Sequence, residues 1–245
     1  ANENWTRTWD GKEKNILMEQ KYSEQDDRQH FQEILQYFKD DRYIKIDGKP
    51  FFAVYRTNIF PDIRRTASIW REEATKAGLN GIYLVTVESW NNKIDPQTIG
   101  FDAAIDFQPN IVRTHKRKLG PFFQRVLNKL KINKSPYYTN NVYDYQEYVD
   151  LEIAKERPLY KQFPGITPMW DNSARKKENA NILIQSTPEK FGEWYQHIVN
   201  TFKPYSVEEN FVFINAWNEW AEGNHLEPCL KWGTSYLEQI SKHRK

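Results

Sequence analysis

NFVFINAWNEWAEGNHLEP, residues Asn210–Pro228, sets the expectations for the rest of the chain. It begins with Phe211–Ile214, a short run of β-branched and aromatic residues that is typical of a buried strand. Within a few residues it turns polar, and acids, amides and indoles crowd together. Since sites in α/β folds lie beyond the carboxyl ends of parallel strands, this pattern predicts a strand that leaves the core and enters a site.

Glu219 and Glu222 are the candidate catalytic pair. Residues three apart on a helical turn lie on one side, with Cβ atoms roughly 5–6 Å apart. Two carboxylates at that separation can divide acid and base roles if their environments push their pKa values apart. The alternative is a solvated polar loop, because so short a motif often arises by chance. Trp217 and Trp220 favour the site, because an exposed indole beside acids is costly unless something stacks on it.

Length and composition predict one domain, residues 1–245, with a sizeable core. The net charge of +2 implies no nucleic acid or other strong polyanion as partner. One cysteine, Cys229, excludes an internal disulfide and fits a reducing compartment. No apolar run approaches the length of a membrane span and no signal peptide is visible, so we expect a cytoplasmic location. Because residue 1 is Ala and the chain opens like the end of a strand, we expect a fragment or a processed chain.

Strand-like and helix-like patterns alternate along the chain, which predicts parallel β/α units in one sheet. The predicted strands are 1–5 (the end of one), 51–56, 81–87, 103–109, 164–170 and 211–217. The predicted helices are 30–43, 62–79, 121–132, 141–157, 188–202 and 234–242. Polar and aromatic residues follow nearly every strand, which favours a barrel over a doubly wound sheet. We therefore expect an N-terminally truncated α/β (β/α)8 TIM-type barrel, with about six of its eight units present.

Six of the nine tryptophans fall at predicted strand ends, at positions 5, 9, 90, 170, 217 and 220. They could plug the mouth of the barrel or form platforms for sugar rings. Because a ligand site combines aromatic walls with a few convergent polar groups, we favour sugar platforms for some of them.

The stretch Arg113–Lys134 holds eight Lys or Arg residues and no acid. Within it, Pro121–Ile132 reads as a short basic amphipathic helix. Most charge runs are solvated excursions, and that is one interpretation here. The other is a peripheral contact with an anionic membrane, here the inner membrane, where lipid-linked glycans are assembled.

Metal and cofactor motifs are incomplete in this sequence. Glu222 and His225 have the spacing of one half of a di-iron carboxylate site, but that site needs a second such motif, so we expect no metal. The sequence contains neither a P-loop nor GxGxxG, so we expect no cofactor. The lack of a nucleotide motif leans mildly against a conventional nucleotide-sugar transferase.

The motifs ANENWTRTWDG, DGKPFFAVYR, GITPMWDNSARK and FINAWNEWAEGNHLEP resemble the WbsX-like proteins of bacterial polysaccharide loci, labelled glycosyltransferases. Those proteins in turn resemble glycoside hydrolase family 99, the endo-α-mannosidases, through the pattern NEWxEGxxxEP. The resemblance implies a (β/α)8 barrel that lacks its first two units here. It implies that Glu219 deprotonates a sugar 2-hydroxyl, which attacks C1, and that Glu222 is the general acid of a retaining reaction. Ala221 stands where family 99 commonly has His.

Three kinds of function stay open from the sequence. The first is an enzyme that cleaves or transfers internal glycosidic bonds of a bacterial polysaccharide or O-antigen. The second is a nucleotide-sugar-dependent transferase of lipopolysaccharide biosynthesis, and the third is a glycan-binding barrel without catalysis. The acid pair favours the first. The expected substrate-binding residues are Glu3, Asn4, Trp5, Trp9, Tyr55, Arg56, Trp170, Asp171, Asn172, Asn218, Trp220, His225 and Glu227.

Overall fold

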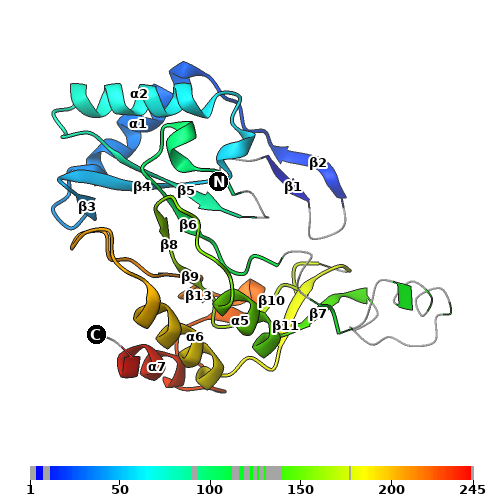
Figure 1. The fold of residues 1–245 in the computed structure, drawn as a ribbon. Coiled ribbons are helices and arrows are strands. Elements are labelled where there is room, and N and C mark those ends of the chain that lie inside the picture. Colours follow the sequence, from blue (N-terminus) through cyan, green and yellow to red (C-terminus); the bar gives the residue numbers. More distant parts are fainter. Residues whose placement is uncertain are drawn as a thin grey trace.

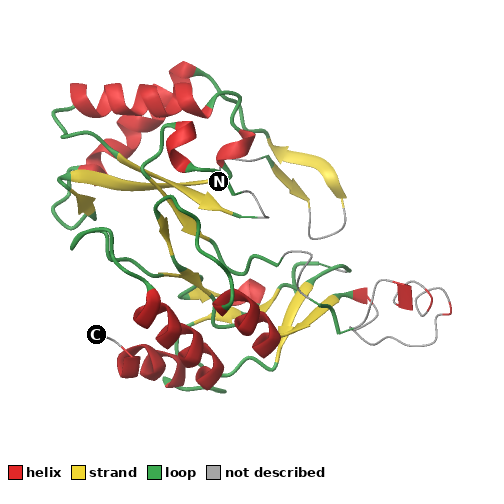
Figure 2. Ribbon diagram, viewed as in Figure 1, coloured by secondary structure: helices red, strands yellow, loops and turns green. Residues whose placement is uncertain are grey.

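The computed structural model describes residues 4–7, 12–89, 93–111, 116–118, 122–123, 126, 130, 139–176 and 178–243. Its centre is a set of parallel strands with helices on two sides (Figures 1 and 2). Four neighbouring strands run parallel in chain order: β4 (Lys49–Tyr55), β5 (Tyr83–Glu88), β6 (Ala103–Asp106) and β8 (Gln162–Phe163). A short strand, β3 (Lys45–Ile46), pairs antiparallel with the start of β4.

The strand order continues on the far side of Pro164. There the chain forms β9 (Gly165–Ile166), which pairs in parallel with β12 (Phe213–Ile214). Gly165 is required at this point, because a Cβ atom there would lie 1.8 Å from the backbone oxygen of Asp106. The chain order of β4, β5, β6, β8–β9 and β12 confirms the expected parallel β/α arrangement for five of the six predicted strands.

The inward side chains of these strands meet in one aromatic interior. Phe51 of β4 and Phe213 of β12 have ring centroids 5.8 Å apart, and Phe51 lies 5.4 Å from Phe211. Phe163 of β8 packs against the same rings. Since β4 and β12 are at opposite ends of the strand order, their contact requires the strands to curl around a shared interior. This is the curvature of a half-barrel, and the complete eight-unit barrel stays a prediction.

Helices α1 (Glu24–Phe38) and α2 (Ile63–Lys76) cover the outer face of β4 and β5. Each begins at a capping side chain: Ser23 Oγ accepts from the Asp26 amide at 3.0 Å, and Asp62 does the same for Arg65 at 3.0 Å. Trp70 of α2 packs edge-on against Phe52 of β4. The predicted helix over 62–79 is confirmed, whereas the one over 30–43 begins earlier and ends at Phe38.

The second helix group is formed by α5 (Tyr145–Ile153), α6 (Pro188–Thr201) and α7 (Ser235–His243). They lie together below the strands in Figure 1 and bury Trp194, Tyr236 and other apolar side chains. Pro188 stands in the first turn of α6, where its missing N–H removes no bond. The helices predicted over 188–202 and 234–242 are confirmed.

The N-terminal segment differs from the expectation. Residues Trp5–Arg7 (β1) and Lys12–Met18 (β2) form an antiparallel hairpin, not the end of a strand in the main sheet. Asn4 Oδ1 accepts from the Gln20 amide at 2.7 Å and ties the two ends of the hairpin together. ANENWTRTWDG was expected to be the end of a strand, and no strand was predicted for Lys12–Met18, the second half of the hairpin.

A second small sheet was also missed. Strand β7 (Asn141–Asp144) pairs in parallel with β11 (Asn181–Ile184), and β11 pairs antiparallel with β10 (Trp170–Asp171). The helix predicted over 141–157 therefore begins only after Asp144, whose carboxylate accepts from the amides of Gln146 and Glu147. This N-cap makes 141–144 available for strand pairing.

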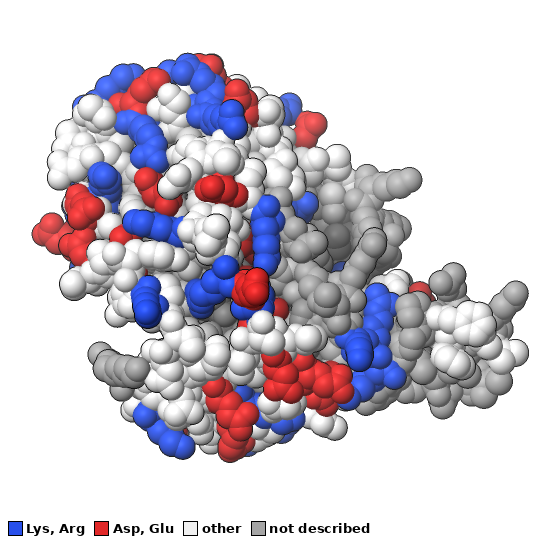
Figure 3. Space-filling view, in the orientation of Figure 1, with Lys and Arg blue, Asp and Glu red and all other residues white. Residues whose placement is uncertain are grey.

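The surface carries both signs of charge, interspersed in the view of Figure 3. Most of the basic stretch 113–134, with the helix predicted over 121–132, lies outside the described residues. Among the residues that the structure does describe, no helix is both long and apolar enough to cross a bilayer.

Candidate functional site

The candidate pair lies on a short excursion that follows β12. Strands β13 (Asn218–Glu219) and β14 (Asn224–His225) form a hairpin, and the 3-10 turn Trp220–Glu222 joins them. Gly223 closes the turn with φ 55°, in the left-handed region where a side chain is strained. A Cβ atom on Gly223 would lie 3.1 Å from Asp171, so the turn packs closely on β10.

Arg175 brings the two carboxylates together. Its Nη1 atom lies 3.1 Å from Glu222 Oε1 and 3.8 Å from Glu219 Oε1. Both acids therefore face one guanidinium, on the same side of the hairpin. The guanidinium is closer to Glu222 than to Glu219. Asn218 is exposed on β13.

The two acids have different surroundings. The side chain of Glu222 is 21% exposed and that of Glu219 is 41% exposed. Burial raises the pKa of the Glu222 carboxyl above its ordinary value; the positive charge of Arg175 opposes this rise, and the negative charge of Glu219 adds to it. The drier of the two acids is thus Glu222, the one whose proposed role requires it to hold a proton.

Trp220 forms a supported platform beside the pair. Its ring stacks on His225 with centroids 3.8 Å apart, and its Nε1 donates to Glu227 Oε2 at 2.7 Å. About half of Trp220 stays exposed, whereas both ring nitrogens of His225 are buried and find no partner among the described residues. Burial lowers the pKa of His225, so the ring is neutral near pH 7. His225 and Glu227 therefore orient the indole.

An open cavity of about 760 Å³ adjoins this platform. Trp220 and His225 line one part of it, and Trp232 lines another. Lys231 lies over the Trp232 ring with Nζ 4.5 Å from its centroid. The remaining lining residues are Met169, Ser186, Pro228, Cys229, Leu230 and Lys231. The cavity is thus walled mainly by indole and apolar surface, and neither Glu219 nor Glu222 lines it.

The segment after β9 contributes mostly support. Asn172 is buried, and its Oδ1 accepts from the Asn181 amide at 2.9 Å, which holds β10 against β11. Asp171 accepts from the Ser173 amide at 2.9 Å and packs on Gly223. Trp170 is half-buried against the core. These three predicted substrate-binding residues lie beside the hairpin, and Asp171 touches it directly.

The residues predicted from the earlier strands lie further away. Tyr55 ends β4 and Arg56 follows it, and β4 is at the opposite end of the strand order from β12. Tyr55 contacts Phe107 and lines a separate cavity of about 440 Å³ between β4 and α1. Asn4 and Trp5 are on the β1–β2 hairpin, which Figure 1 shows apart from β13. Glu3 and Trp9 lie outside the described residues.

Sequence reasoning did not identify the groups that hold the hairpin. Asn224 and Thr167 are fully buried, and their side chains are hydrogen-bonded to each other. Asn215 is hydrogen-bonded to the backbone oxygen of Gln108 and to the side chain of Asn224. Thr167 and Asn215 each follow an apolar strand directly, and this position was their signal in the sequence. Trp232, in the wall of the larger cavity, was not singled out either.

Comparison of the sequence with known proteins assigns the chain to a family. A family model described as glycosyltransferase WbsX matches residues 1–240. Two proteins named WxcX and described as uncharacterized, from two strains of Xanthomonas campestris pv. campestris, are each 33% identical over 242 residues. These alignments cover 97% of this chain and 33% of each relative, so the chain spans about a third of their length.

Solved structures share the fold at low sequence identity. A glycoside hydrolase-like protein superposes with a TM-score of 0.57 at 12% identity, over 89% of this chain and 61% of that one. The family 99 endo-α-mannosidase from Bacteriodes thetaiotaomicron, in complex with bis-tris-propane, gives a TM-score of 0.49 at 14% identity, over 92% and 68%. The first of these likenesses supports a glycoside-hydrolase-like fold, and the family match covers nearly the whole sequence. The chain belongs to the WbsX glycosyltransferase family.

Proposed function

We propose that this protein is a carbohydrate-active enzyme of bacterial polysaccharide or O-antigen metabolism that cleaves or transfers internal glycosidic bonds with retention. The observation that carries the proposal is the pair of carboxylates facing one guanidinium in unequal environments. Paired acids with separated pKa values are the usual machinery of glycosidic bond cleavage. The family membership and the hydrolase-like fold support the same class of chemistry.

In this proposal Glu222 is the general acid and Glu219 is the base. A general acid must still hold its proton near neutral pH, and burial raises the pKa of Glu222 in that direction. Glu219 is more exposed and takes the proton of the sugar 2-hydroxyl, whose oxygen then attacks C1 to form a 1,2-anhydro sugar. Glu222 gives its proton to the departing glycosidic oxygen as the bond to C1 breaks. Water, or an acceptor hydroxyl, then attacks C1 of the anhydro sugar as Glu222 removes its proton, and Glu219 returns the proton that it took to O2. Arg175 holds both carboxylates on the side where the sugar binds.

The sugar ring would stack on the exposed face of Trp220. Flat indole surface suits the C–H face of a pyranose, and this indole is fixed by His225 and Glu227 before any ligand arrives. The cavity lined by Trp220 and Trp232 would then accept a neighbouring sugar unit. The remaining predicted binding residues would come from the other strand ends around the mouth of the barrel.

The test uses a polypeptide as long as the WxcX relatives. It is incubated with the surface polysaccharide of the bacterium that produces it. Products are read by mass spectrometry with and without nucleotide sugars. Chain shortening without a donor is the expected result, since the sequence shows no nucleotide motif. Donor-dependent chain growth would instead support the nucleotide-sugar transferase that the family description favours. Binding without turnover would support a non-catalytic glycan-binding barrel.

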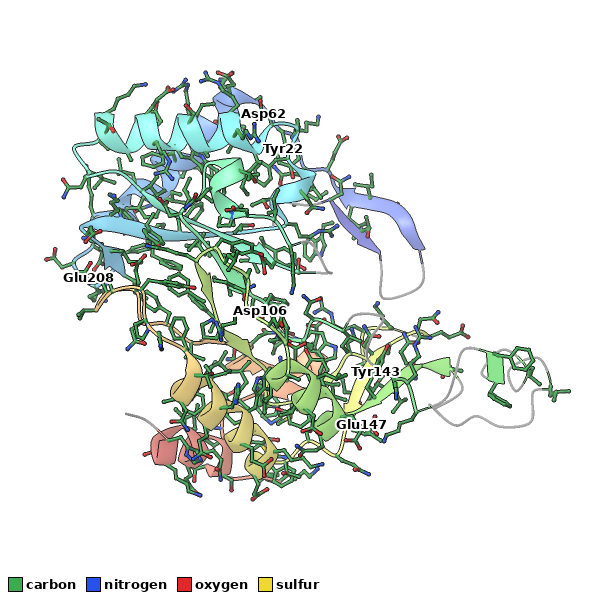
Figure 4. All side chains as sticks on the ribbon, in the orientation of Figure 1. Tyr22, Asp62, Asp106, Tyr143, Glu147 and Glu208 are labelled. Carbon is green, nitrogen blue, oxygen red and sulfur yellow. The ribbon has the colours of Figure 1, made fainter. Side chains whose placement is uncertain are left out.

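We also propose that residues 113–134 contact the anionic face of the inner membrane from the cytoplasmic side. Phe122, Phe123 and Leu130 within this stretch are each more than half exposed, among eight basic residues and no acid. The stretch is attached at its start: Arg117 donates to Tyr143, and Lys118 to Glu147, both of which Figure 4 labels. Exposed aromatic groups among lysines suit a shallow insertion into anionic lipid.

Co-sedimentation with liposomes tests the membrane contact. Binding should require anionic lipid, weaken with salt, and fall when Lys129, Lys131 and Lys134 are changed to Gln. Equal sedimentation with neutral and anionic vesicles, or no difference between the variants, would contradict it.

A further inference from the structure

The hairpin that carries the acid pair cannot be stable by itself. Strands β13 and β14 have two residues each, far below the length at which a hairpin persists in water. Its backbone is joined to the preceding chain where the Leu226 amide donates to Trp217 O at 2.9 Å and the Glu227 amide to the same oxygen at 2.8 Å. These bonds fix its base, whereas the turn that holds Glu222 needs a further attachment.

Asn224 supplies that attachment. It has no exposed surface, and in the hairpin it stands directly opposite Glu219. Its Nδ2 donates to Asn215 O at 2.8 Å. Its Oδ1 lies 3.2 Å from Thr167 Oγ1, which shares its single proton between Asn224 and the closer Met169 O at 2.9 Å. The first bond fixes which end of the amide faces Asn215, so the carbonyl end must face the threonine hydroxyl. Because both ends of this buried side-chain amide are hydrogen-bonded, the amide, and the turn that carries it, are held in one position.

The partners of Asn224 belong to the ends of separate strands. Thr167 directly follows β9, and Asn215 directly follows β12. Asn215 Nδ2 in turn donates to the backbone oxygen of Gln108, just beyond β6, at 2.8 Å. Gln108 is itself buried, and its Nε2 donates to Glu152 of α5 at 2.8 Å. A continuous set of buried and partly buried polar bonds thus connects three neighbouring strands to the hairpin.

We propose that Asn224, held by Thr167 and Asn215, is a positioning residue that sets where Glu219 and Glu222 stand above the strand ends. It touches no substrate and acts through the hairpin. The inference rests on the proposed function, because the position of the pair matters to the rate only if the pair reacts. A displacement of about 1 Å at a reacting group can cost about a hundredfold in rate.

The variants are chosen to remove one hydroxyl with little change of shape. Thr167→Val deletes the hydroxyl that is shared between Asn224 Oδ1 and Met169 O, and Thr167→Ser keeps it. Thr86→Val is the matched control, because Thr86 is equally buried and loses a hydroxyl bonded to Thr57, on β5 and away from the hairpin. Asn224→Asp is a second, stronger variant, because it replaces the donor to Asn215 with an acceptor. Circular dichroism establishes that each variant is folded.

The first measurement needs no ligand. The carboxyl carbon of Glu222 is followed by ¹³C NMR through a pH titration and assigned with Glu222→Gln. In Thr167→Val the pKa of Glu222 should move toward the ordinary value for glutamate, because a loosened turn admits water. Thr167→Ser and Thr86→Val should match the wild type. If Thr167→Val and Asn224→Asp both fold and leave this titration unchanged, the positioning role is wrong.

The second measurement uses the polysaccharide that the wild-type protein cleaves. Thr167→Val should lower kcat by about tenfold to a hundredfold and leave KM within about twofold, because binding contacts remain while the pair is misplaced. Loss shared equally by Thr86→Val would reduce Thr167 to a general structural role and overturn the proposal. If the wild type cleaves no glycan, the proposed function fails by itself, and the NMR titration still decides whether Thr167 fixes the surroundings of Glu222.

Discussion

Glu219 and Glu222 share one guanidinium and differ in their contact with water. The chemistry of the pair depends on this difference, since two carboxylates in identical surroundings could not keep one proton in a fixed place. Arg175 and Lys176 are the cations that lower the pKa of Glu222, and Glu219 is the anion that raises it. Burial is the largest of these influences and leaves the pKa raised.

The raised pKa of Glu222 makes a prediction about stability. A carboxyl whose pKa is higher in the folded state stabilises the fold fully below its unfolded pKa, and this contribution is lost as pH rises through the folded pKa. Glu222→Gln removes the ionisable group. The free energy of unfolding of this variant, minus that of the wild type, should therefore increase between about pH 4 and about pH 7.

Urea denaturation across that pH range measures the difference. Glu193→Gln, on the exposed face of α6, controls for the loss of one carboxylate from the chain. A difference for Glu222→Gln that stays flat with pH would mean that burial of Glu222 leaves its titration unaltered.

Arg175 gives a second prediction at the residue scale. Its cation opposes the rise in the pKa of Glu222, so Arg175→Gln should raise that pKa further. The alkaline limb of the kcat profile, which reports loss of the general acid's proton, should then move to higher pH. Arg175→Lys keeps a charge and should shift the limb less. The profile is measured between about pH 5 and about pH 9 in full-length protein, and an alkaline limb that moves down would contradict this reading of Arg175.

At the scale of elements, the tight turn Trp220–Glu222 requires Gly223 directly after it. Its φ of 55° is strained for any residue with a side chain, and the added Cβ would press on Asp171. Gly223→Ala should cost about 1 kcal/mol or more of stability and should lower kcat with it, because the turn begins directly after Glu219 and holds Glu222. Gly78→Ala is the control: its φ is also positive but its Cβ would meet nothing within 4 Å. Equal effects on kcat from the two variants would exclude a special role for this turn.

Apolar runs, capping residues and helical periodicity were sufficient to predict most of the regular elements from the sequence. The strands containing residues 51–55, 83–87, 103–106 and 213–214 came from such runs, as did α2, α6 and α7. The strand at 181–184 was missed although NILI is an apolar run, because no helix separates it from the strand before it. The strand at 141–144 was merged with a helix, because its pairing with β11 is a contact across 40 residues that no local pattern encodes.

The residues of the candidate site differ in how visible they are in the sequence, for a related reason. Glu219, Glu222, Trp220 and Asp171 were recognisable because charged and aromatic residues at a strand end are conspicuous. The buried amide of Asn224 was not, because a small polar residue in a loop has the same appearance whether it is solvated or holds a turn. Only its zero exposure in the fold separates the two.

At the scale of the whole molecule, the parallel sheet has an open edge along β4. Strand β5 pairs with one edge of β4, and among the described residues no strand pairs with the other edge over 52–55. Exposed strand edges promote association between chains. The 245-residue chain alone should therefore associate, and Ala53→Lys, at an exposed position of β4, should reduce association by placing charge there. Analytical ultracentrifugation compares the two, and a monomeric wild type would contradict an open edge.

The division of labour within the acid pair is the central claim, and leaving-group dependence tests it most directly. In full-length protein, Glu222→Gln should lose about 10²–10⁴ in rate on a natural glycan but far less on the matching glycosyl fluoride, whose leaving group needs no proton. Glu219→Gln should slow the reaction of both substrates alike, because the base that Glu219 provides is needed whichever leaving group departs. If Glu222→Gln were equally slow on the glycan and the fluoride, Glu222 would not be the general acid and the account would be wrong.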